Sequence, residues 1–144
     1  MKKLLFRLFS LSYLLFLSSC GSSDNQFELI GNADVSDGTM IYVLQADQNN
    51  QPYIKDSTSV QSNSFKFKGI SSTPQISYIQ VQGVNGYVLA ILENGDIKAD
   101  IYKDSISKSK VYGTKSNDDF IKYKSETKSL VEDMNSISST AQDA

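Results

Sequence analysis

The order of apolar and polar residues divides the chain into an apolar leader, a strand-rich middle and a helical end. Residues 26–113 alternate short β-prone runs with turn residues, at the spacing typical of an all-β sandwich. Phe65 and Phe67 alternate with lysines, which is typical of a half-buried antiparallel strand. The pattern therefore predicts an antiparallel β-sandwich of about seven or eight strands over residues 26–113.

Three neighbouring runs in this region, at residues 76–82, 87–93 and 96–102, predict a three-stranded meander. They are joined by Asn-Gly pairs at residues 85–86 and 94–95, and Asn-Gly supplies the positive φ angles of a type I′ hairpin turn. The middle run is apolar on both faces, so we expect it to lie centrally in its sheet. The third run should turn its apolar residues inward, namely Ile97, Ala99 and Ile101.

After Gly113 the apolar spacing changes to that of a helix. Ser116 is the predicted N-cap, and Asp118 and Asp119 suit the positive end of the helix dipole. The helix should run from about 117 to about 138, within a C-terminal unit of residues 114–144. Its apolar stripe should pack on the sandwich, on another copy or on a partner protein; the stripe positions are Phe120, Tyr123, Thr127, Leu130, Met134, Ile137 and Ala141.

The leader, residues 1–19, has the form of a signal peptide: two lysines follow Met1, and residues 4–17 are mostly apolar. As a helix these fourteen residues would span about 21 Å at about 1.5 Å each, less than the roughly 30 Å of a bilayer core. The run Leu-Ser-Ser-Cys at 17–20 resembles a lipobox. We therefore predict cleavage before Cys20 and acylation of its thiol, with palmitate-like chains that anchor the protein in a membrane.

Residues 20–25 are polar and small, and we expect them to form a tether between the lipid and the folded domain. Gly21 is not the acidic residue that often retains a lipoprotein in the inner membrane. We therefore expect the protein in the cell envelope, on the outer membrane and facing the periplasm.

Composition restricts the chemistry of the mature chain. Without the leader the net charge is −5, from 11 Lys against 16 Asp and Glu, which disfavours nucleic-acid binding. The chain has no His and its single Cys is the predicted acylation site. A His-based triad, a His metal ligand and a Cys-x-x-Cys redox pair are thereby excluded, and we expect no cofactor and no bound metal.

Two short motifs resemble sites but lack residues that such sites need. Residues 32–38 resemble the start of a calcium loop, but the Gly comes one position late and Val43 stands where the ligating Glu belongs. Asp56-Ser57 lacks a base with a pKa near neutrality. Tyrosines are the remaining candidates, because exposed rings can form a platform for a sugar or peptide; the residues in question are Tyr42, Tyr78, Tyr87 and Tyr102.

The same residues carry a family resemblance. The runs at 27–31, 38–42 and 65–69, followed by Val111-Tyr-Gly-Thr114 and Asn117, are similar to a domain of unknown function, family 4369, found in lipoproteins of the Bacteroidetes. That domain usually precedes a thioredoxin-like domain of the peroxiredoxin or disulfide-reductase kind. The resemblance thus implies an envelope β-sandwich that positions such a partner. The sequence has no Cys-x-x-Cys, so the redox activity is not carried over.

Three functions follow as hypotheses. The first is a non-enzymatic, membrane-anchored interaction or positioning module, with a protein partner on the helix stripe, chiefly Phe120, Tyr123, Leu130, Met134 and Ile137. The second is the N-terminal part of a thioredoxin-like thiol-disulfide oxidoreductase. The third is a lipoprotein that binds a glycan or a peptide.

Overall fold

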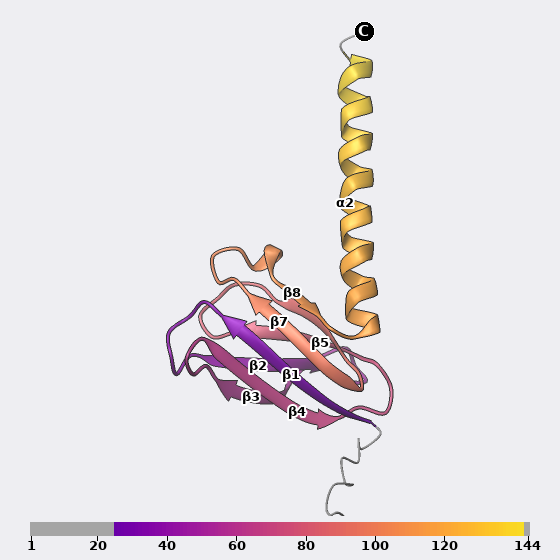
Figure 1. The fold of residues 1–144 in the computed structure, drawn as a ribbon. Helices are drawn as coiled ribbons and strands as arrows, with labels where there is room; N and C mark the ends of the chain where they lie inside the picture. The colour runs from indigo at the N-terminus through magenta and orange to yellow at the C-terminus, as the bar shows by residue number, and fades with distance from the viewer. Residues whose placement is uncertain (1–24, 143–144) are drawn as a thin grey trace, which may run out of the picture.

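The computed structural model describes the backbone of residues 25–142 and the side chains of residues 25–136. Two four-stranded sheets lie face to face, and one long helix leaves them at one corner (Figure 1). The first sheet has the strand order β4-β1-β7-β8, with bounds Ser64–Ile70, Gln26–Ala33, Gly95–Ile101 and Lys110–Tyr112. The second has the order β3-β2-β5-β6, with bounds Pro52–Ser59, Met40–Ala46, Gln75–Val81 and Val88–Leu92.

In the first sheet β1 lies between two long strands. It pairs antiparallel with β4, where Leu29 is opposite Phe67, and parallel with β7, where Leu29 is opposite Ile97. A parallel pair requires a long connection, and here the whole second sheet lies between β1 and β7 along the chain. The predicted sandwich of about seven or eight strands with a C-terminal helix is confirmed: there are eight strands, and all pairs except β1–β7 are antiparallel.

The core lies between the two inner faces. Buried and exposed side chains alternate along β1 and β7, as the pleat of a strand with one solvated face requires. Ile97, Ala99 and Ile101 point inward as predicted, with exposures of 1%, 2% and 2%. Leu29 from the first sheet and Ile41 and Ile79 from the second are likewise almost fully buried.

The predicted meander over residues 76–102 is wrong. β5 and β6 do pair antiparallel, but β7 crosses to the other sheet and pairs with β1 and β8. The two-residue connection Glu93-Asn94 therefore joins two sheets rather than two strands of one hairpin. Sequence spacing could not reveal this, because a short joint between sheets and a hairpin turn both place a glycine with positive φ between β runs.

The prediction that the 87–93 run is central is also wrong, because β6 is the last strand of the second sheet. Its outward residues Leu89 and Ile91 are half-buried for another reason: the start of the helix packs beside β6. Apolar residues on both faces of a strand indicate that both faces are covered, and the covering element can be a sheet or a helix.

The predicted type I′ turn at Asn85-Gly86 does not form. Gly83 and Gly86 have positive φ angles of 76° and 105°, within a six-residue connection between β5 and β6. A two-residue turn with both φ angles positive forms instead at Ser62-Asn63, with φ angles of 51° and 60°. The backbones of Gln61 and Ser64 exchange hydrogen bonds of 2.9 and 3.0 Å around this turn.

Two glycines of the first sheet lie under aromatic rings of the neighbouring strand. Gly31 is opposite Phe65 and Gly69 is opposite Phe27. A Cβ atom on Gly31 would lie 2.1 Å from Cζ of Phe65, and one on Gly69 would lie 2.7 Å from Cε1 of Phe27. The rings occupy the space that side chains would fill, which closes the core at both ends of the β1–β4 pair.

The helix, α2, spans Lys115–Gln142, somewhat longer than the predicted 117–138. The predicted N-cap Ser116 is wrong, because Ser116 is already inside the first turn. Thr114 precedes the helix, and its carbonyl accepts a 2.9 Å hydrogen bond from the backbone nitrogen of Asp118. Figure 1 shows α2 rising away from the sandwich. Its contacts with the sandwich are concentrated on β8 and β6.

Candidate functional site

The predicted leader and the predicted acylation site at Cys20 lie outside the described residues. Among residues 25–142, the helix that the structure contains is not long and apolar enough to cross a membrane. The candidate sites in the described part of the chain are therefore the outer surfaces of the sandwich and of α2.

The outer face of the second sheet carries apolar side chains from all four strands, with Ser57 and Gln80 as polar neighbours of Tyr42. Strand register places Leu44 of β2 between Ile54 of β3 and Tyr78 of β5, and Tyr78 opposite Leu89 of β6. Ile76 is opposite Ile91, two register positions further along. We call this surface the tyrosine face and define it by Tyr42, Leu44, Ile54, Ile76, Tyr78, Tyr87, Leu89 and Ile91.

Much of the tyrosine face is open to solvent: Ile76 is 62% exposed, Tyr87 59% and Ile54 57%. Single exposed apolar residues are ordinary, but a contiguous exposed apolar patch on a soluble domain is typical of an interaction site.

Three of the four tyrosines proposed as a platform lie on this face. The rings of Tyr78 and Tyr87 meet edge to face, with centroids 6.3 Å apart. Tyr42 is half-buried on the neighbouring strand, diagonal to Tyr78. Tyr102 is not part of the group, because it follows the end of β7 in the other sheet.

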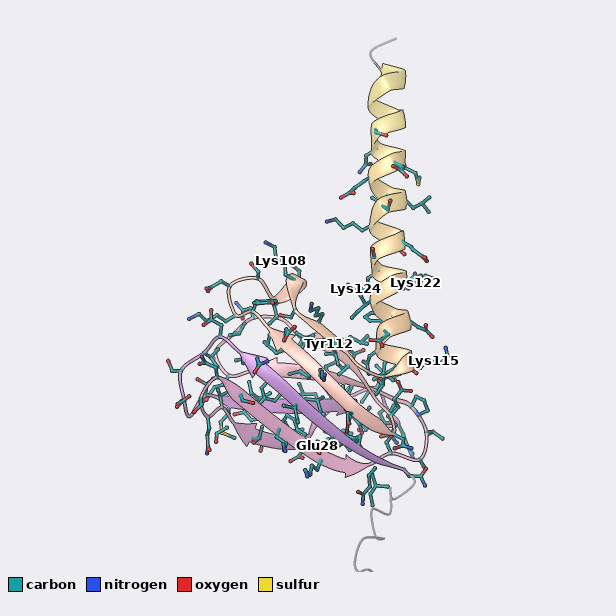
Figure 2. The ribbon with its side chains drawn as sticks, viewed as in Figure 1. Glu28, Lys108, Tyr112, Lys115, Lys122 and Lys124 are labelled. Carbon is teal, nitrogen blue, oxygen red and sulfur yellow. The ribbon has the colours of Figure 1, made fainter. Side chains whose placement is uncertain are left out.

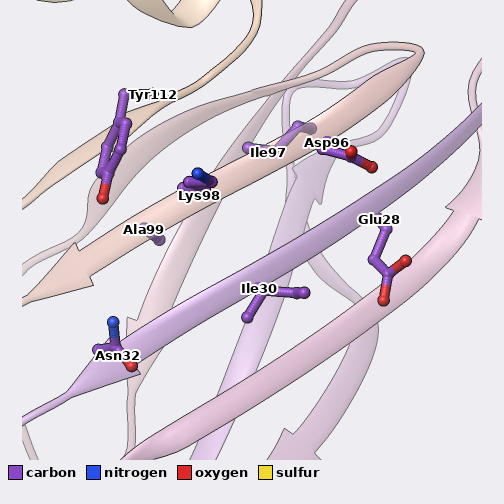
Figure 3. A pocket seen from close by; sticks show the side chains of 8 residues that line it. All are labelled: Glu28, Ile30, Asn32, Asp96, Ile97, Lys98, Ala99 and Tyr112. Carbon is purple, nitrogen blue, oxygen red and sulfur yellow. The ribbon is translucent and has the colours of Figure 1, made fainter.

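The outer face of the first sheet is charged instead. Glu28 forms ion pairs with Lys66 and, at 3.5 Å, with Lys68, and Asp100 lies 3.8 Å from Lys110. The hydrogen bond from Lys66 is the main reason that the pKa of Glu28 is lowered. Figures 2 and 3 show Glu28 and Tyr112 on this side of the molecule.

A shallow hollow of about 360 Å³ lies on the charged face. Its walls come from β1, β7 and β8, and they include Glu28, Ile30, Asn32, Asp96, Lys98 and Tyr112 (Figure 3). Charges of both signs alternate here, as on an ordinary solvated sheet surface. Among the described residues, no three His, Cys, Asp or Glu side chains gather closely enough to hold a metal ion.

The joint between the sandwich and α2 is a network of polar contacts. Glu93 follows β6, and its carboxylate accepts hydrogen bonds from the backbone nitrogen of Ser116 at 2.8 Å and the hydroxyl of Ser116 at 2.7 Å. A carboxylate at this position satisfies free N–H groups of the first helical turn and suits the helix dipole.

These contacts set the protonation of Glu93. Partial burial acts to raise its pKa, but the hydrogen bonds from Ser116 and Thr114 outweigh burial, and the pKa is lowered overall. Glu93 is therefore ionised at neutral pH and fixes the start of α2.

Asn117 completes the joint by covering the free edge of β6. Its side-chain amide donates to the carbonyl of Ile91 at 2.8 Å and accepts from the nitrogen of Ile91 at 2.9 Å, as a neighbouring strand would. Nδ2 also donates to the hydroxyl of Thr114 at 2.8 Å, and Asn117 is only 1% exposed. An open sheet edge invites pairing with another chain, so this contact blocks that route.

Beyond the joint, α2 presents the predicted stripe to solvent. Every residue from 122 to 136 is exposed, and Tyr123, Leu130 and Met134 are 63%, 62% and 62% exposed. Phe120 is half-buried, and the side chain of Ile137 lies outside the described side chains. The expected packing of this stripe on the sandwich is thus limited to its first residue.

Few interactions within α2 stabilise its exposed part. Three ion pairs lie along it, each with Lys preceding an acid by four residues: Lys115–Asp119, Lys122–Glu126 and Lys128–Glu132. Each such pair is worth about 0.2–0.5 kcal/mol, and this order of charges is the weaker one. The segment 135–140 contains one Asn, three Ser and one Thr, which are poorer helix formers than Ala.

Comparison with known proteins identifies the sandwich. The family described as Domain of unknown function (DUF4369) matches residues 27–120, about two thirds of the chain. The chain belongs to the DUF4369 family. No curated protein and no solved structure is significantly similar to it.

The DUF4369 match begins at the second residue of β1, includes the other seven strands in full and ends at Phe120, the stripe residue that lines a hollow against the sandwich. The family resemblance seen in the sequence is confirmed. The residues that carried it now have physical roles: Gly31 and Gly69 lie under phenylalanine rings, and Asn117 joins β6 to α2.

Sequence reasoning missed Glu93 as a functional contact and missed the role of Asn117. Both lie at ends of elements, and their partners are 23 and 26 residues away in the chain. The available signal was the placing of Asn117 three residues after Thr114, where a side chain can reach back to the start of the helix.

Proposed function

We propose that this DUF4369 protein is a lipid-anchored, non-catalytic interaction module of the cell envelope. Acylated Cys20 attaches it to the outer membrane on the periplasmic side, and the tether of residues 20–25 holds the sandwich beside the bilayer. Its task is to bind a partner protein and to hold that partner near the membrane.

The observation that carries the proposal is the tyrosine face. Aliphatic and aromatic side chains cross four strands without a charged residue among the eight that define the face. An exposed, uncharged surface rich in aromatic and aliphatic side chains suits contact with another protein, because aromatic residues and the exclusion of charge typify the centres of protein interfaces.

The titratable groups support a non-catalytic role. The pKa values of Glu28 and Glu93 are lowered, and that of Lys115 is raised chiefly by its hydrogen bond with Asp119. All three shifts move away from neutrality, whereas general acids and bases are tuned toward it.

The anchor is tested by fractionation of cells that express the full chain. The native protein should partition with membranes and into detergent, and mass spectrometry should find an acylated N-terminal cysteine at position 20. Cys20→Ala should give a soluble or unprocessed form. A native N-terminus with an unmodified thiol would remove the anchor from the proposal.

The surface is tested by photo-cross-linking in the same cells. A photoactivatable phenylalanine at Tyr78 places the probe on the tyrosine face, and the same group at Lys66 is the matched control on the charged face. We expect discrete cross-linked products from Tyr78 and few from Lys66. Equal yields from the two sites, or none from Tyr78, would contradict a partner on the tyrosine face.

A further inference from the structure

We propose that α2 pairs with α2 of a second copy of this chain, as a parallel, in-register, two-stranded coiled coil. The inference rests on the proposed function, because the lipid anchor concentrates the copies in one membrane and orients them alike. It goes beyond that function by naming the partner of the helix stripe.

The spacing of the stripe is the first argument. From Phe120 to Ala141 its positions alternate by three and four residues, through three heptads. A mean spacing of 3.5 residues is that of a coiled-coil seam, whereas a helix that packs on a globular body needs a wider apolar face. α2 has the narrow seam, with Leu130 and Met134 exposed at its middle.

The direction of the stripe is the second argument. Phe120, Ile121 and Lys124 line a hollow together with residues of the sandwich, so this side of the first turns of α2 faces the sandwich. Tyr123, Leu130 and Met134 lie on a different side of the helix, since each residue turns about 100° around the axis. A second helix can therefore lie along the seam beside the sandwich rather than in place of it.

The charges next to the seam select the orientation. If Phe120 is an a position, the g positions are Asp119, Glu126 and Asp133, all acidic, and the e positions are Lys124, Val131 and Ser138. An antiparallel pair would set the acidic g rows against each other. A parallel pair sets each acidic g residue against a lysine, valine or serine at the e position five residues later on the partner, so that no like charges meet.

The exposure of α2 explains why it needs a partner. Residues 122–136 are exposed, and three weak ion pairs are the contacts between charged groups along the described part of the helix. Most helical stability in proteins comes from packing of an apolar face. A second copy supplies that packing along the seam from Tyr123 onward. Short coiled coils associate weakly in dilute solution, and attachment to one surface raises the effective concentration.

Single cysteines test the pairing in native membranes. The chain has no other cysteine than Cys20, whose thiol is acylated in the proposed lipoprotein. Tyr123→Cys and Leu130→Cys each place a thiol on the seam, and Lys128→Cys, one heptad after Ile121, places one away from the seam as the matched control. Under mild oxidation we expect disulfide-linked homodimers from both seam variants, lost on reduction, and few from Lys128→Cys.

Each other result overturns the proposal in a recognisable way. Homodimers from Leu130→Cys without homodimers from Tyr123→Cys indicate an antiparallel pair. Cross-links from the seam cysteines to a different protein indicate that the stripe binds that protein and not a second copy. Equal yields from the seam and from Lys128→Cys indicate random collision. All of these positions are exposed, so circular dichroism should show an unchanged fold.

A soluble form separates this inference from the proposed anchor. The mature chain with Cys20→Ser should show a concentration-dependent dimer in analytical ultracentrifugation. Leu130→Asp should weaken its association by about tenfold or more, because it buries a charge in the seam. If the soluble form dimerises but the native chain does not partition with membranes, the proposed anchor is wrong and the proposed pairing of helices stands. If the native chain is membrane-bound but the seam cysteines form no cross-links, the proposed anchor stands and the proposed pairing is wrong.

Discussion

The two sheets of the sandwich are alike on the inside and opposite on the outside. Both supply alternating apolar residues to one shared core. The outer face of the first sheet carries ion pairs such as Glu28–Lys66, while the outer face of the second carries Tyr78, Leu89 and Ile76. The difference teaches that exposed residues such as Tyr78 and Ile76 do not serve the shared core, and this is the basis of the partner site proposed for that face.

The two sheets also differ in how their cores and edges are closed. The first closes its core by seating phenylalanine rings over Gly31 and Gly69. The second ends at β6, whose edge is covered by Asn117 from α2. The helix is thus joined to the second sheet at β6 through Glu93 and Asn117, and it also packs against β8, the edge strand of the first sheet. Four predictions test this contrast.

The largest effect is expected inside the first sheet. In Gly31→Ala the new Cβ would lie 2.1 Å from Phe65, so the ring or the backbone must move. We expect the free energy of unfolding to fall by about 1–3 kcal/mol, as for other overpacked cores. Urea denaturation of the mature chain measures it. Adding Phe65→Leu should recover part of the loss, and purely additive effects of the two changes would show that the ring is not the obstacle.

The next effect is expected at the edge of the second sheet. Asn117→Ala leaves the backbone N–H and carbonyl of Ile91 without their present partner, which should cost about 1–3 kcal/mol of stability. The amide of Ile91 should also exchange its hydrogen faster, as measured by mass spectrometry or NMR. Asn135→Ala, on the exposed part of α2, is the control and should change neither quantity noticeably. Unchanged exchange at Ile91 would show that Asn117 does not protect the edge.

A smaller effect is expected from acid at the same joint. The pKa of Glu93 is lowered in the folded state, so its contribution to stability is complete above the ordinary pKa of Glu and is lost as the pH falls through the folded value. The native chain should therefore exceed Glu93→Gln in stability most at neutral pH, and the gap should close in acid. Thermal unfolding over a pH series measures the gap, and a gap that widens in acid would refute the assignment.

The smallest effects are expected on the two outer faces. Ile76→Ser and Lys66→Ser should each change the free energy of unfolding by no more than about 0.5 kcal/mol, because both side chains are exposed. They should differ in partner binding: Ile76→Ser should reduce the cross-links formed from Tyr78, and Lys66→Ser should not. A large loss of stability in Ile76→Ser would mean that the tyrosine face serves the fold.

Local patterns in the sequence determined much of this protein. The alternation around Phe65 and along β7 reports a strand with one solvated face, and the three-and-four spacing after Gly113 reports a helix. These patterns are readable because strand and helix periods are properties of neighbouring residues. The family resemblance likewise followed from short runs, and the match over residues 27–120 confirms it.

Only the tertiary structure decided which strands are neighbours. β6 and β7 are two residues apart in the chain and lie in different sheets, while β1 and β7 pair across more than 60 residues. The gathering of Tyr42, Tyr78 and Tyr87, the exclusion of Tyr102 and the bond from Asn117 to Ile91 all depend on that choice. Pairing between distant strands is set by how the whole core packs, and no local period records it.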